Sequence, residues 1–395
     1  MKIRSVYMDN AATSFPKAPG VADAVFAYLT KIGSNINRGS YSQALEAEDL
    51  VWETRELLCD LFSSPKPEYV VFTKNITESL NILIKGLLKP ADHVLVSSME
   101  HNAVLRPLNH LKSKFNELLD ISILPCNVDG ELPQGRELEK MLESHLKPNT
   151  KALIITHASN VCGTILPIIE LGAFCDQHGL FFLVDSAQTA GIEHLNFLEI
   201  KADALAFTGH KGLLGPQGIG GLILSERIAS QLEPLITGGT GSSSEKEFQP
   251  SYMPDRFEAG TLNIPGIYGL NASLKYLHKI GLDAIKEKET LLIKRFLCGI
   301  SDLQGVSLIG KSALTNRTAV LSLDFSGSDL ALVSHRLSSV YGITNRCGLH
   351  CAPLAHKTLG TFPQGTLRLS PGYFNTLEDI DYTLVAIRDC IDYFS

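Results

Sequence analysis

The sequence predicts an α/β protein whose large domain is built on a mostly parallel sheet, with a smaller α+β domain after it. Its 395 residues are enough for two domains with separate cores. Between about residues 69 and 208, short apolar segments typical of strands alternate with helical segments, as in a parallel sheet covered on both faces. We expect an N-terminal arm over residues 1–20 that belongs with the small domain, a large domain over 21–265, and a connecting helix with the small domain over 266–395.

The composition is that of an ordinary globular protein, with 44% hydrophobic and 19% charged residues. A formal net charge of −7 argues against a general nucleic-acid binder, which would carry a basic face. No apolar run approaches the length of a membrane span, and the segment YMDNAATS begins too early to leave room for a signal peptide. We therefore expect a cytoplasmic protein that binds neither nucleic acid nor membrane.

Eight cysteines are scattered along the chain, which in a large cytosolic protein indicates reduced thiols and not a disulfide framework. Cys347 and Cys351 lie close together, but a C-x3-C pair with no second pair at ligand spacing is a weak zinc signal. The sequence therefore predicts no metal site.

The first 68 residues predict an ordered arm, which begins like a short strand, and then two helices. The first helix is expected from about Val21 to Thr30. The second begins near Ser42, with acidic residues in its first turns, where the helix dipole favours them.

The segment YVVFTKNITESLNILIKGLL predicts a strand over residues 69–73, a tight loop and a helix from about Thr77. A helix N-terminus directly after a strand presents free N–H groups and the positive end of the helix dipole, which together bind anions. Thr77 is therefore a candidate phosphate contact. On this stretch alone, a helix-capping role for Thr77 is the simpler interpretation.

Three more polar residues follow predicted strands, namely His101 after HVLVSSME, Asn160 after ALIITHAS and Asp185 after LFFLV. A histidine at such a place either stacks on a planar cofactor or hydrogen-bonds within its loop. A carboxylate next to a buried apolar run needs a partner, because an unpaired buried charge is costly, so Asp185 either pairs with a cation or caps the next turn.

The stretch FTGHKGLLGPQGIGGL, residues 207–222, carries a lysine directly after a strand expected over residues 202–207. A lysine attacks an aldehyde only where its pKa is lowered, and a partly desolvated loop at the end of a sheet can lower it. Lys211 is therefore the candidate for the amine that binds pyridoxal 5′-phosphate (PLP) covalently, and the glycines would let the backbone turn tightly. By itself the motif fits a solvated lysine in a glycine-rich hairpin equally well.

The predicted strands bring these candidates together. Because parallel strands all end at the same edge of a sheet, Thr77, His101, Asn160, Asp185 and Lys211 are expected to gather there. A protonated pyridine nitrogen of PLP would be the cation that Asp185 requires.

The second half of the chain predicts a loop, a long helix and the small domain. Residues 226–269 are polar and rich in glycine and serine, which indicates a mobile or partner-contacting loop. One long amphipathic segment over about 268–303 leads to the small domain, where SLIG, TAVLSLDF, GITNRC and TLRLSPG are typical of strands around the helix DLALVSHRLSSVYG.

With these residues in place, the chain resembles the class V aminotransferase-like PLP enzymes, and among them the cysteine desulfurases and selenocysteine lyases. The resemblance runs nearly end to end, through the motifs DNAATS, SSMEHNAV, ASNVCGT, VDSAQ, FEAGTLN and SPGYFNT. It implies the fold type I of PLP-dependent aminotransferases. It also implies that PLP is bound to Lys211, that His101 stacks on the ring, and that Asp185 pairs with the pyridine nitrogen.

The resemblance assigns further cofactor contacts. Asn160 and Gln188 would contact the ring oxygen and the substrate side, while the phosphate would be held by Thr77, Thr208 and His210.

It also assigns substrate and subunit contacts. Arg368 in GTLRLSPG matches the arginine that grips the substrate carboxylate, a task for a bidentate guanidinium, and Ala12 and Arg346 would lie on the substrate side. Thr261 resembles the threonine that reaches the phosphate of a neighbouring subunit, which implies a homodimer.

The segment NRCGLHCAP resembles the short R-x-G-x-x-C-A loop of one desulfurase group, and this places Cys351 as the sulfur-accepting thiol with Arg346 beside it. A nearby cation favours the thiolate, which is the nucleophile. Cys347 is unusual in that loop, and either resolves a persulfide as a disulfide or is a bystander. Tyr41 and Asn37 stand where relatives carry histidines.

The sequence therefore predicts a PLP-dependent cysteine desulfurase that converts L-cysteine to L-alanine, leaves a persulfide on Cys351 and passes sulfur to an acceptor protein. Two other interpretations stay open. One is a selenocysteine lyase or another class V enzyme in which Cys351 is idle. The other is a catalytically silent binding partner in sulfur trafficking.

Overall fold

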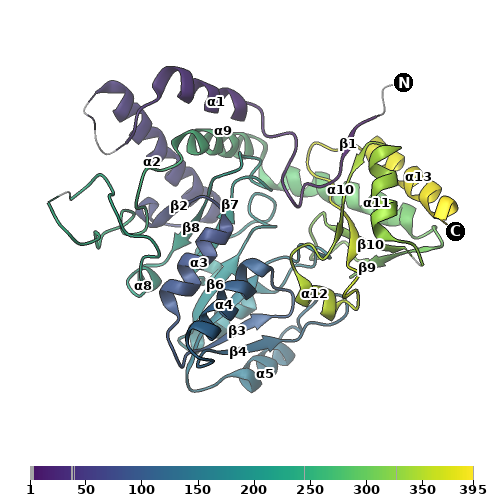
Figure 1. Ribbon diagram of the computed structural model, residues 1–395, viewed down its shortest axis with the longest axis horizontal. Helices are drawn as coiled ribbons and strands as arrows, with labels where there is room; N and C mark the ends of the chain where they lie inside the picture. The colour runs from purple at the N-terminus through teal and green to yellow at the C-terminus, as the bar shows by residue number, and fades with distance from the viewer. Residues whose placement is uncertain (1–3, 37–38, 40, 244, 326, 395) are drawn as a thin grey trace.

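The computed structural model describes residues 4–36, 39, 41–243, 245–325 and 327–394, and its elements are arranged around two sheets (Figure 1). The larger sheet has seven strands in the order β2-β8-β7-β6-β5-β3-β4, and all are parallel except β8. Its strands are β2 (Val70–Thr73), β3 (His93–Ser97), β4 (Asp120–Leu124), β5 (Thr150–Thr156), β6 (Phe181–Asp185), β7 (Ala204–Thr208) and β8 (Gly220–Leu224). The predicted α/β class with a mostly parallel sheet is confirmed.

Both faces of the larger sheet are buried, because its strands are apolar at successive positions. In β5, Leu153 and Ile155 pack into one core while Ala152 and Ile154 pack into the core on the opposite face. The first core is shared with α1 (Val21–Ala27), α2 (Ser42–Phe62), α5 (Arg136–His145), α6 (Ile168–Gln177), α7 (Phe197–Ile200) and α9 (Ile264–Ile280). The second is shared with α3 (Ile76–Leu87), α4 (Asn102–Lys114) and α8 (Glu226–Ala229).

The smaller sheet is antiparallel, in the order β12-β13-β10-β9, and lies to the right of the larger one in Figure 1. Its strands are β9 (Val306–Ile309), β10 (Leu321–Phe325), β12 (Arg346–Gly348) and β13 (Thr366–Leu369). The N-terminal strand β1 (Val6–Tyr7) pairs with β11 (Ile343–Thr344) beside this sheet. Their shared core includes residues of α10 (Leu282–Ile300), α11 (Leu330–Ser339) and α13 (Leu377–Phe394), and the short helix α12 (Pro353–Thr358) lies against the larger sheet's loops.

The expectation of one continuous segment between the two sheets is wrong, because the chain breaks between α9 and α10 at Gly281. That residue has φ 84°, in the left-handed region that glycine adopts without strain. α9 packs on α2, where Asn271 donates to Glu53 and Thr54. After the break, α10 begins in the core of the larger sheet with Leu282 and Ile285 and continues into the core of the smaller sheet.

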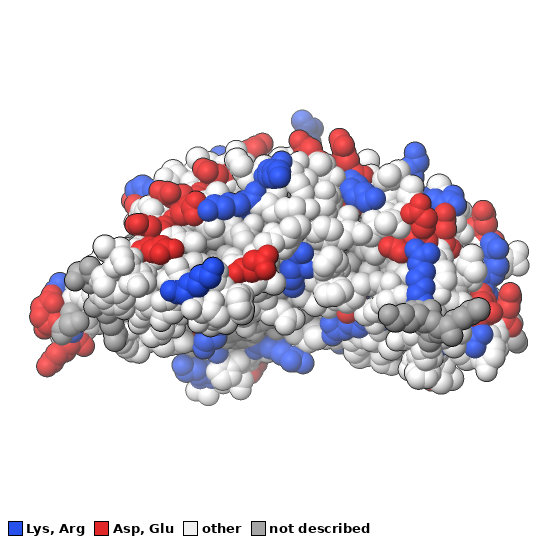
Figure 2. Space-filling model, turned by 90° about the horizontal axis from the view of Figure 1, so that it is seen from above, with Lys and Arg blue, Asp and Glu red and all other residues white. Residues whose placement is uncertain are grey.

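Within the described ranges, no helix is both long and apolar enough to cross a membrane. On the face shown in Figure 2, basic and acidic side chains are interspersed.

A buried ion pair ties α2 to the loop that leads into α9. Arg55 and Glu258 are 3% and 8% exposed, and the guanidinium donates two hydrogen bonds to the carboxylate, at 2.7 and 3.1 Å. The Phe72 N–H also donates to Glu258, at 2.6 Å. The pair therefore fixes the position of the FEAGT segment against the edge strand β2.

Replacing Glu258 with alanine is expected to lower the free energy of unfolding by about 3–5 kcal/mol, because it leaves the buried Arg55 charge without its anionic partner. Urea titration followed by circular dichroism measures this loss. Asp381→Ala, which breaks the exposed ion pair with Arg295, is the control and should change stability much less. Similar losses in the two variants would contradict the assignment.

Candidate active site

Lys211 lies in the loop between β7 and β8, which packs directly on the turn after β6. A Cβ on Gly212 would lie 2.5 Å from the Ala190 oxygen, and one on Gly191 would lie 2.4 Å from the Gly212 oxygen, so only glycines allow this contact. Over residues 207–222, all described, Gly218 is the glycine with a positive φ, at 79°. Gly212 and Gly218 lie in turns, as expected, whereas Gly220 and Gly221 belong to β8, where close packing requires glycine.

The Lys211 amine has a lowered pKa of about 8. Loss of solvation on burial is the largest cause, and the guanidinium groups of Arg368 and Arg346 add to it, while the Asp185 carboxylate opposes it. About one-tenth of such an amine is neutral at pH 7, and the neutral amine is the form that attacks an aldehyde. The environment of Lys211 is therefore suited to forming a Schiff base.

Asp185 is the last residue of β6 and is 2% exposed. Its Oδ1 accepts a hydrogen bond of 2.9 Å from the Ala187 N–H, so it does cap the following turn. Burial nevertheless raises the pKa of this carboxyl, with the Ala187 N–H and Lys211 opposing. A cationic pyridine nitrogen would relieve that cost, so the two interpretations of Asp185 are compatible.

His101 caps α4, since its Nδ1 accepts a hydrogen bond of 3.0 Å from the Ala103 N–H. Burial, with Lys211 and nearby arginines, lowers its pKa to about 4. The ring is therefore neutral at pH 7, and because Nδ1 accepts, the proton is on Nε2.

Two buried polar atoms without partners fit the predicted phosphate site. The Thr208 Oγ1 and the His210 Nδ1 have no hydrogen-bond partner in the part of the chain that the structure describes. Thr208 ends β7 and pairs with Gly220 of β8, which in turn pairs with Thr73 at the end of β2. Since α3 begins just after β2, its N-terminus lies near these two atoms, and a phosphate would satisfy both.

Thr77 lies in the exposed first turn of α3 and does not cap it. The cap is Asn75, whose Oδ1 accepts from the Glu78 N–H at 3.0 Å. The capping interpretation of Thr77 is therefore wrong.

Arg368 reaches this edge from β13 and is 1% exposed. Its Nη2 donates to the Asp9 Oδ1 at 2.8 Å and its Nη1 to the Asn160 oxygen at 3.0 Å. Among the described residues its Nε has no acceptor, so a donor remains for a further anion. Arg346 lies directly opposite on β12 and adds a second positive charge.

The Cys351 loop is held rigidly at the same place. The Asn102 N–H donates to the Cys351 oxygen at 2.8 Å, and the Asn160 side chain donates to the His350 oxygen at 2.7 Å. His350 and Cys351 have φ values of 47° and 60°, an uncommon conformation for such residues. The thiol is exposed, and the Arg346 Nη2 lies 3.7 Å from its Sγ.

Cys347 is expected on the face of β12 opposite to Arg346. Side chains alternate between the faces of a strand, and Arg346, its neighbour in β12, is the one directed at Cys351. The geometry therefore favours the bystander interpretation of Cys347.

The N-terminal arm contributes residues that the sequence analysis did not single out, Asp9 and Lys17. Asp9 holds Arg368 as described, and the Lys17 amine donates to the His210 oxygen at 3.1 Å. Ala12 lies in the same turn of the arm, next to Ala11, whose oxygen accepts from the Gln188 amide at 3.1 Å. The sequence signal that could have identified Asp9 was its position as a charged residue just after the short predicted strand.

The structure brings Thr208, His210, Lys211, Asp185, His101, Asn160, Gln188, Arg368, Arg346 and Cys351 to one edge of the larger sheet. Thr261 is exposed and lines a separate pocket with Thr73 and Lys74. Tyr41 is 53% exposed at the start of α2, and Asn37 lies outside the described residues.

Comparisons with known proteins agree with this geometry. A model of the family described as "Aminotransferase class-V" matches residues 6–383. A probable cysteine desulfurase of Methanothermobacter thermautotrophicus is 34% identical over 95% of this chain and 92% of its own, and one of Pyrococcus abyssi is 33% identical over 98% and 94%. The apo structure of a cysteine desulfurase from Thermococcus onnurineus superposes with a TM-score of 0.90 at 33% identity, over 98% of this chain and 95% of its own. A cysteine desulfurase of Escherichia coli, solved as an S-sulfonic acid, gives 0.87 at 26% identity, over 99% and 96%.

Proposed function

The chain belongs to the aminotransferase class-V family, and on that premise we propose that it is a PLP-dependent cysteine desulfurase that releases L-alanine and keeps the sulfur as a persulfide on Cys351. The observation that carries the proposal is the exposed Cys351 thiol, held on a rigid loop beside Arg346 at the sheet edge that also holds Lys211 and Arg368. A thiol in that place lies beside an arginine that can bind a carboxylate.

The residues that would hold PLP are those described above. Asp185 would bind its pyridine nitrogen, His101 would lie on its ring, and Thr208 and His210 would bind its phosphate with the N-terminus of α3. When bound, PLP supplies an electron sink for charge that forms at Cα of an amino acid. Lys211 is suited to move the Cα proton, because part of it is the neutral amine at pH 7.

In the proposed reaction, Cys351 accepts the sulfur. Its thiolate attacks the substrate sulfur, so that an S–S bond forms while the Cβ–S bond of the substrate breaks. The electron pair of the broken bond goes to Cβ, which is protonated and becomes the methyl group of alanine. Of the two thiol hydrogens present at the start, one ends on that methyl group and one on the persulfide, so no external oxidant or reductant is required.

The experiment is to incubate the purified protein, loaded with PLP, with L-cysteine, and to measure alanine together with the mass of the Cys351 peptide. We expect alanine and a single added sulfur on that peptide. Transfer of the amino group to a 2-keto acid without alanine would indicate an aminotransferase, and turnover of L-selenocysteine alone would indicate a selenocysteine lyase.

Arg368 is proposed to bind the substrate carboxylate through parallel hydrogen bonds. Arg368→Lys keeps the charge but loses the planar guanidinium. The loss of a charged hydrogen bond should raise the activation free energy by about 1.5–3 kcal/mol, which lowers kcat/KM roughly 10- to 150-fold. Steady-state alanine formation measures this. Arg336 lies on α11 and pairs with Asp389, and Arg336→Lys is the matched control. Equal kcat/KM values for the two variants would mean that Arg368 has only a structural role.

We further propose a homodimer with PLP sites near the subunit interface. Thr261 is exposed, and the partly exposed apolar side chains of Leu235 and Ile236 line the same pocket. Sedimentation should give a dimer that weakens when PLP is removed, because a ligand that binds the assembled form stabilises it. A monomer with bound PLP and full activity would contradict the shared site.

A further inference from the structure

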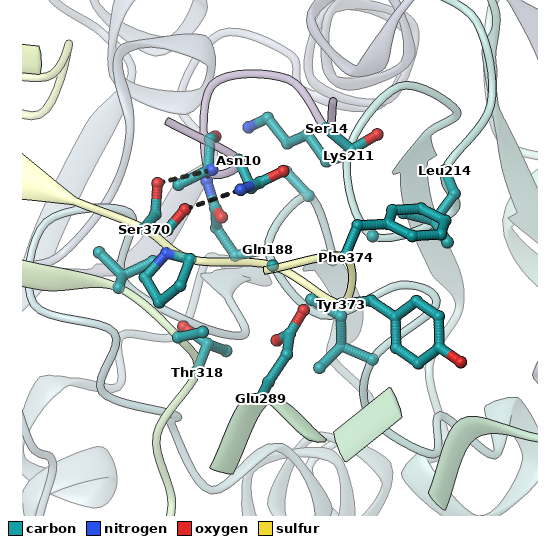
Figure 3. Close-up of a pocket in the computed structure, with 18 residues that line it drawn as sticks. Asn10, Ser14, Gln188, Lys211, Leu214, Glu289, Thr318, Ser370, Tyr373 and Phe374 are labelled. Carbon is teal, nitrogen blue, oxygen red and sulfur yellow. Dashed lines mark hydrogen bonds between the residues drawn. The ribbon is translucent and has the colours of Figure 1, made fainter. Parts of the chain in front are cut away.

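Behind the Lys211 loop lies a pocket whose only acidic lining residue, within the described part of the chain, is Glu289 of α10 (Figure 3). The cavity has a volume of about 40 Å³ and is walled by the N-terminal arm, the turn after β6, residues 318–320 and residues 370–374. It shares Lys211 and Gln188 with the predicted cofactor site, whereas His101, Asp185 and Arg368 do not line it. We call this space the Glu289 pocket.

Glu289 differs from the other buried glutamates that have been described. It is 8% exposed, its carboxylate points into the pocket, and none of the described residues hydrogen-bonds or ion-pairs with it. By contrast, Glu100 accepts from Ser97 and from the Thr156 N–H, and Glu258 accepts from Arg55. Since buried carboxylates are costly without a partner, an unpartnered one that faces a cavity indicates a missing ligand.

The remaining wall defines what that ligand must be. It is largely apolar, from Ile192, Leu214 and Pro371, and two aromatic rings complete it, Tyr373 and Phe374, whose centroids are 5.2 Å apart at 75°. A single carboxylate in an apolar pocket with aromatic rings is the arrangement that recognises organic cations, which gain from both the charge and the ring faces.

We propose that the Glu289 pocket is a binding site for a small organic cation. The pocket shares Lys211 and Gln188 with the predicted cofactor site, but a bound cation is inferred from Glu289 and not from the proposed sulfur chemistry. Because the pocket shares the Lys211 loop, its occupant would lie directly against the backbone that carries the proposed catalytic lysine.

The charges around Glu289 agree with this assignment. Burial, with the neighbouring Glu193 carboxylate, raises the Glu289 pKa to about 8, so the group is mostly the neutral acid at pH 7, and a bound cation would favour its ionised form. Lys286, on the same helix, is neutralised by its 2.6 Å pair with Glu193, and Arg317 donates to the backbone oxygens of Lys311 and Val320. Besides Glu289, the charged residues that line the pocket or the neighbouring space are Lys211, Glu193, Lys286 and Arg317. Among the described residues, none of these pairs with Glu289.

The test uses the PLP-loaded protein and two probes of the same shape, choline and its uncharged analogue 3,3-dimethylbutan-1-ol, measured by isothermal titration calorimetry at pH 8. A quaternary ammonium is chosen because it has no N–H and cannot condense with the cofactor. We expect choline to bind at least tenfold more tightly than the alcohol. Its affinity should fall about tenfold for each pH unit below 7, since the cation binds the ionised carboxylate, and should level off above pH 8.

Two variants distinguish choline binding in the pocket from binding to the protein surface. Glu289→Gln should weaken choline at least tenfold, whereas Glu287→Gln, an equal change of charge at an exposed position on the same helix, should leave it unchanged. Equal binding of the two probes, or equal binding by the wild type and Glu289→Gln, would overturn the proposal, as would no binding of choline at millimolar concentration. If Glu289→Gln does not fold, the comparison of the probes and the pH profile of the wild type still decide the question.

Discussion

Replacing Lys211 with alanine is expected to abolish turnover of L-cysteine, with activity at least about four orders of magnitude below that of the wild type. The variant loses the amine that binds PLP covalently and, in the proposed reaction, the base at Cα, whose contribution alone is about 10²–10⁴-fold. Borohydride reduction of the wild type followed by peptide mapping should find the pyridoxyl group on Lys211, and Lys211→Ala should carry none.

The control for Lys211→Ala is Lys201→Ala, a lysine ten residues earlier that is exposed and paired with Asp176. It should keep PLP and activity. A pyridoxyl group on any lysine other than Lys211, or substantial alanine formation by Lys211→Ala, would end the proposed mechanism.

Replacing Cys351 with alanine is expected to stop persulfide formation and the release of alanine while leaving the bound cofactor unchanged. The Cys351 side chain contacts Arg346 and the loop, whereas the groups that would hold PLP come from other strands, so only the sulfur-transfer step should fail. The absorbance of bound PLP, alanine formation and peptide mass together measure these outcomes.

Cys347→Ser provides the matched control. Because its side chain lies on the other face of β12, it should retain a persulfide on Cys351 and near wild-type alanine formation. Undiminished alanine formation by Cys351→Ala would mean that no protein thiol takes part. Loss of activity in Cys347→Ser would instead favour a resolving role for that residue.

Several features of the site were predictable because they follow from local pattern. Strands buried on both faces appear in the sequence as continuous apolar runs, and parallel strands end at one edge of the sheet. The positions of His101 after β3, Asp185 at the end of β6 and Lys211 after β7 therefore followed from the sequence. The break at Gly281 was missed because a glycine inside an apolar periodic segment is also tolerated in a helix.

The sequence by itself determined the α/β class and the sheet edge at which Lys211 and the other candidate residues lie, because these depend on periodicities of two and 3.6 residues within short segments. Only the tertiary structure decided how Arg368 is held, since its partner Asp9 lies 359 positions away and meets it where the N-terminal arm joins the smaller sheet. The same holds for Glu289, which is an ordinary polar position in the sequence of α10. It becomes a buried acid facing a cavity only because the Lys211 loop and residues 370–374 fold over it. Contacts between such distant segments are set by how whole elements pack, and no local pattern encodes them.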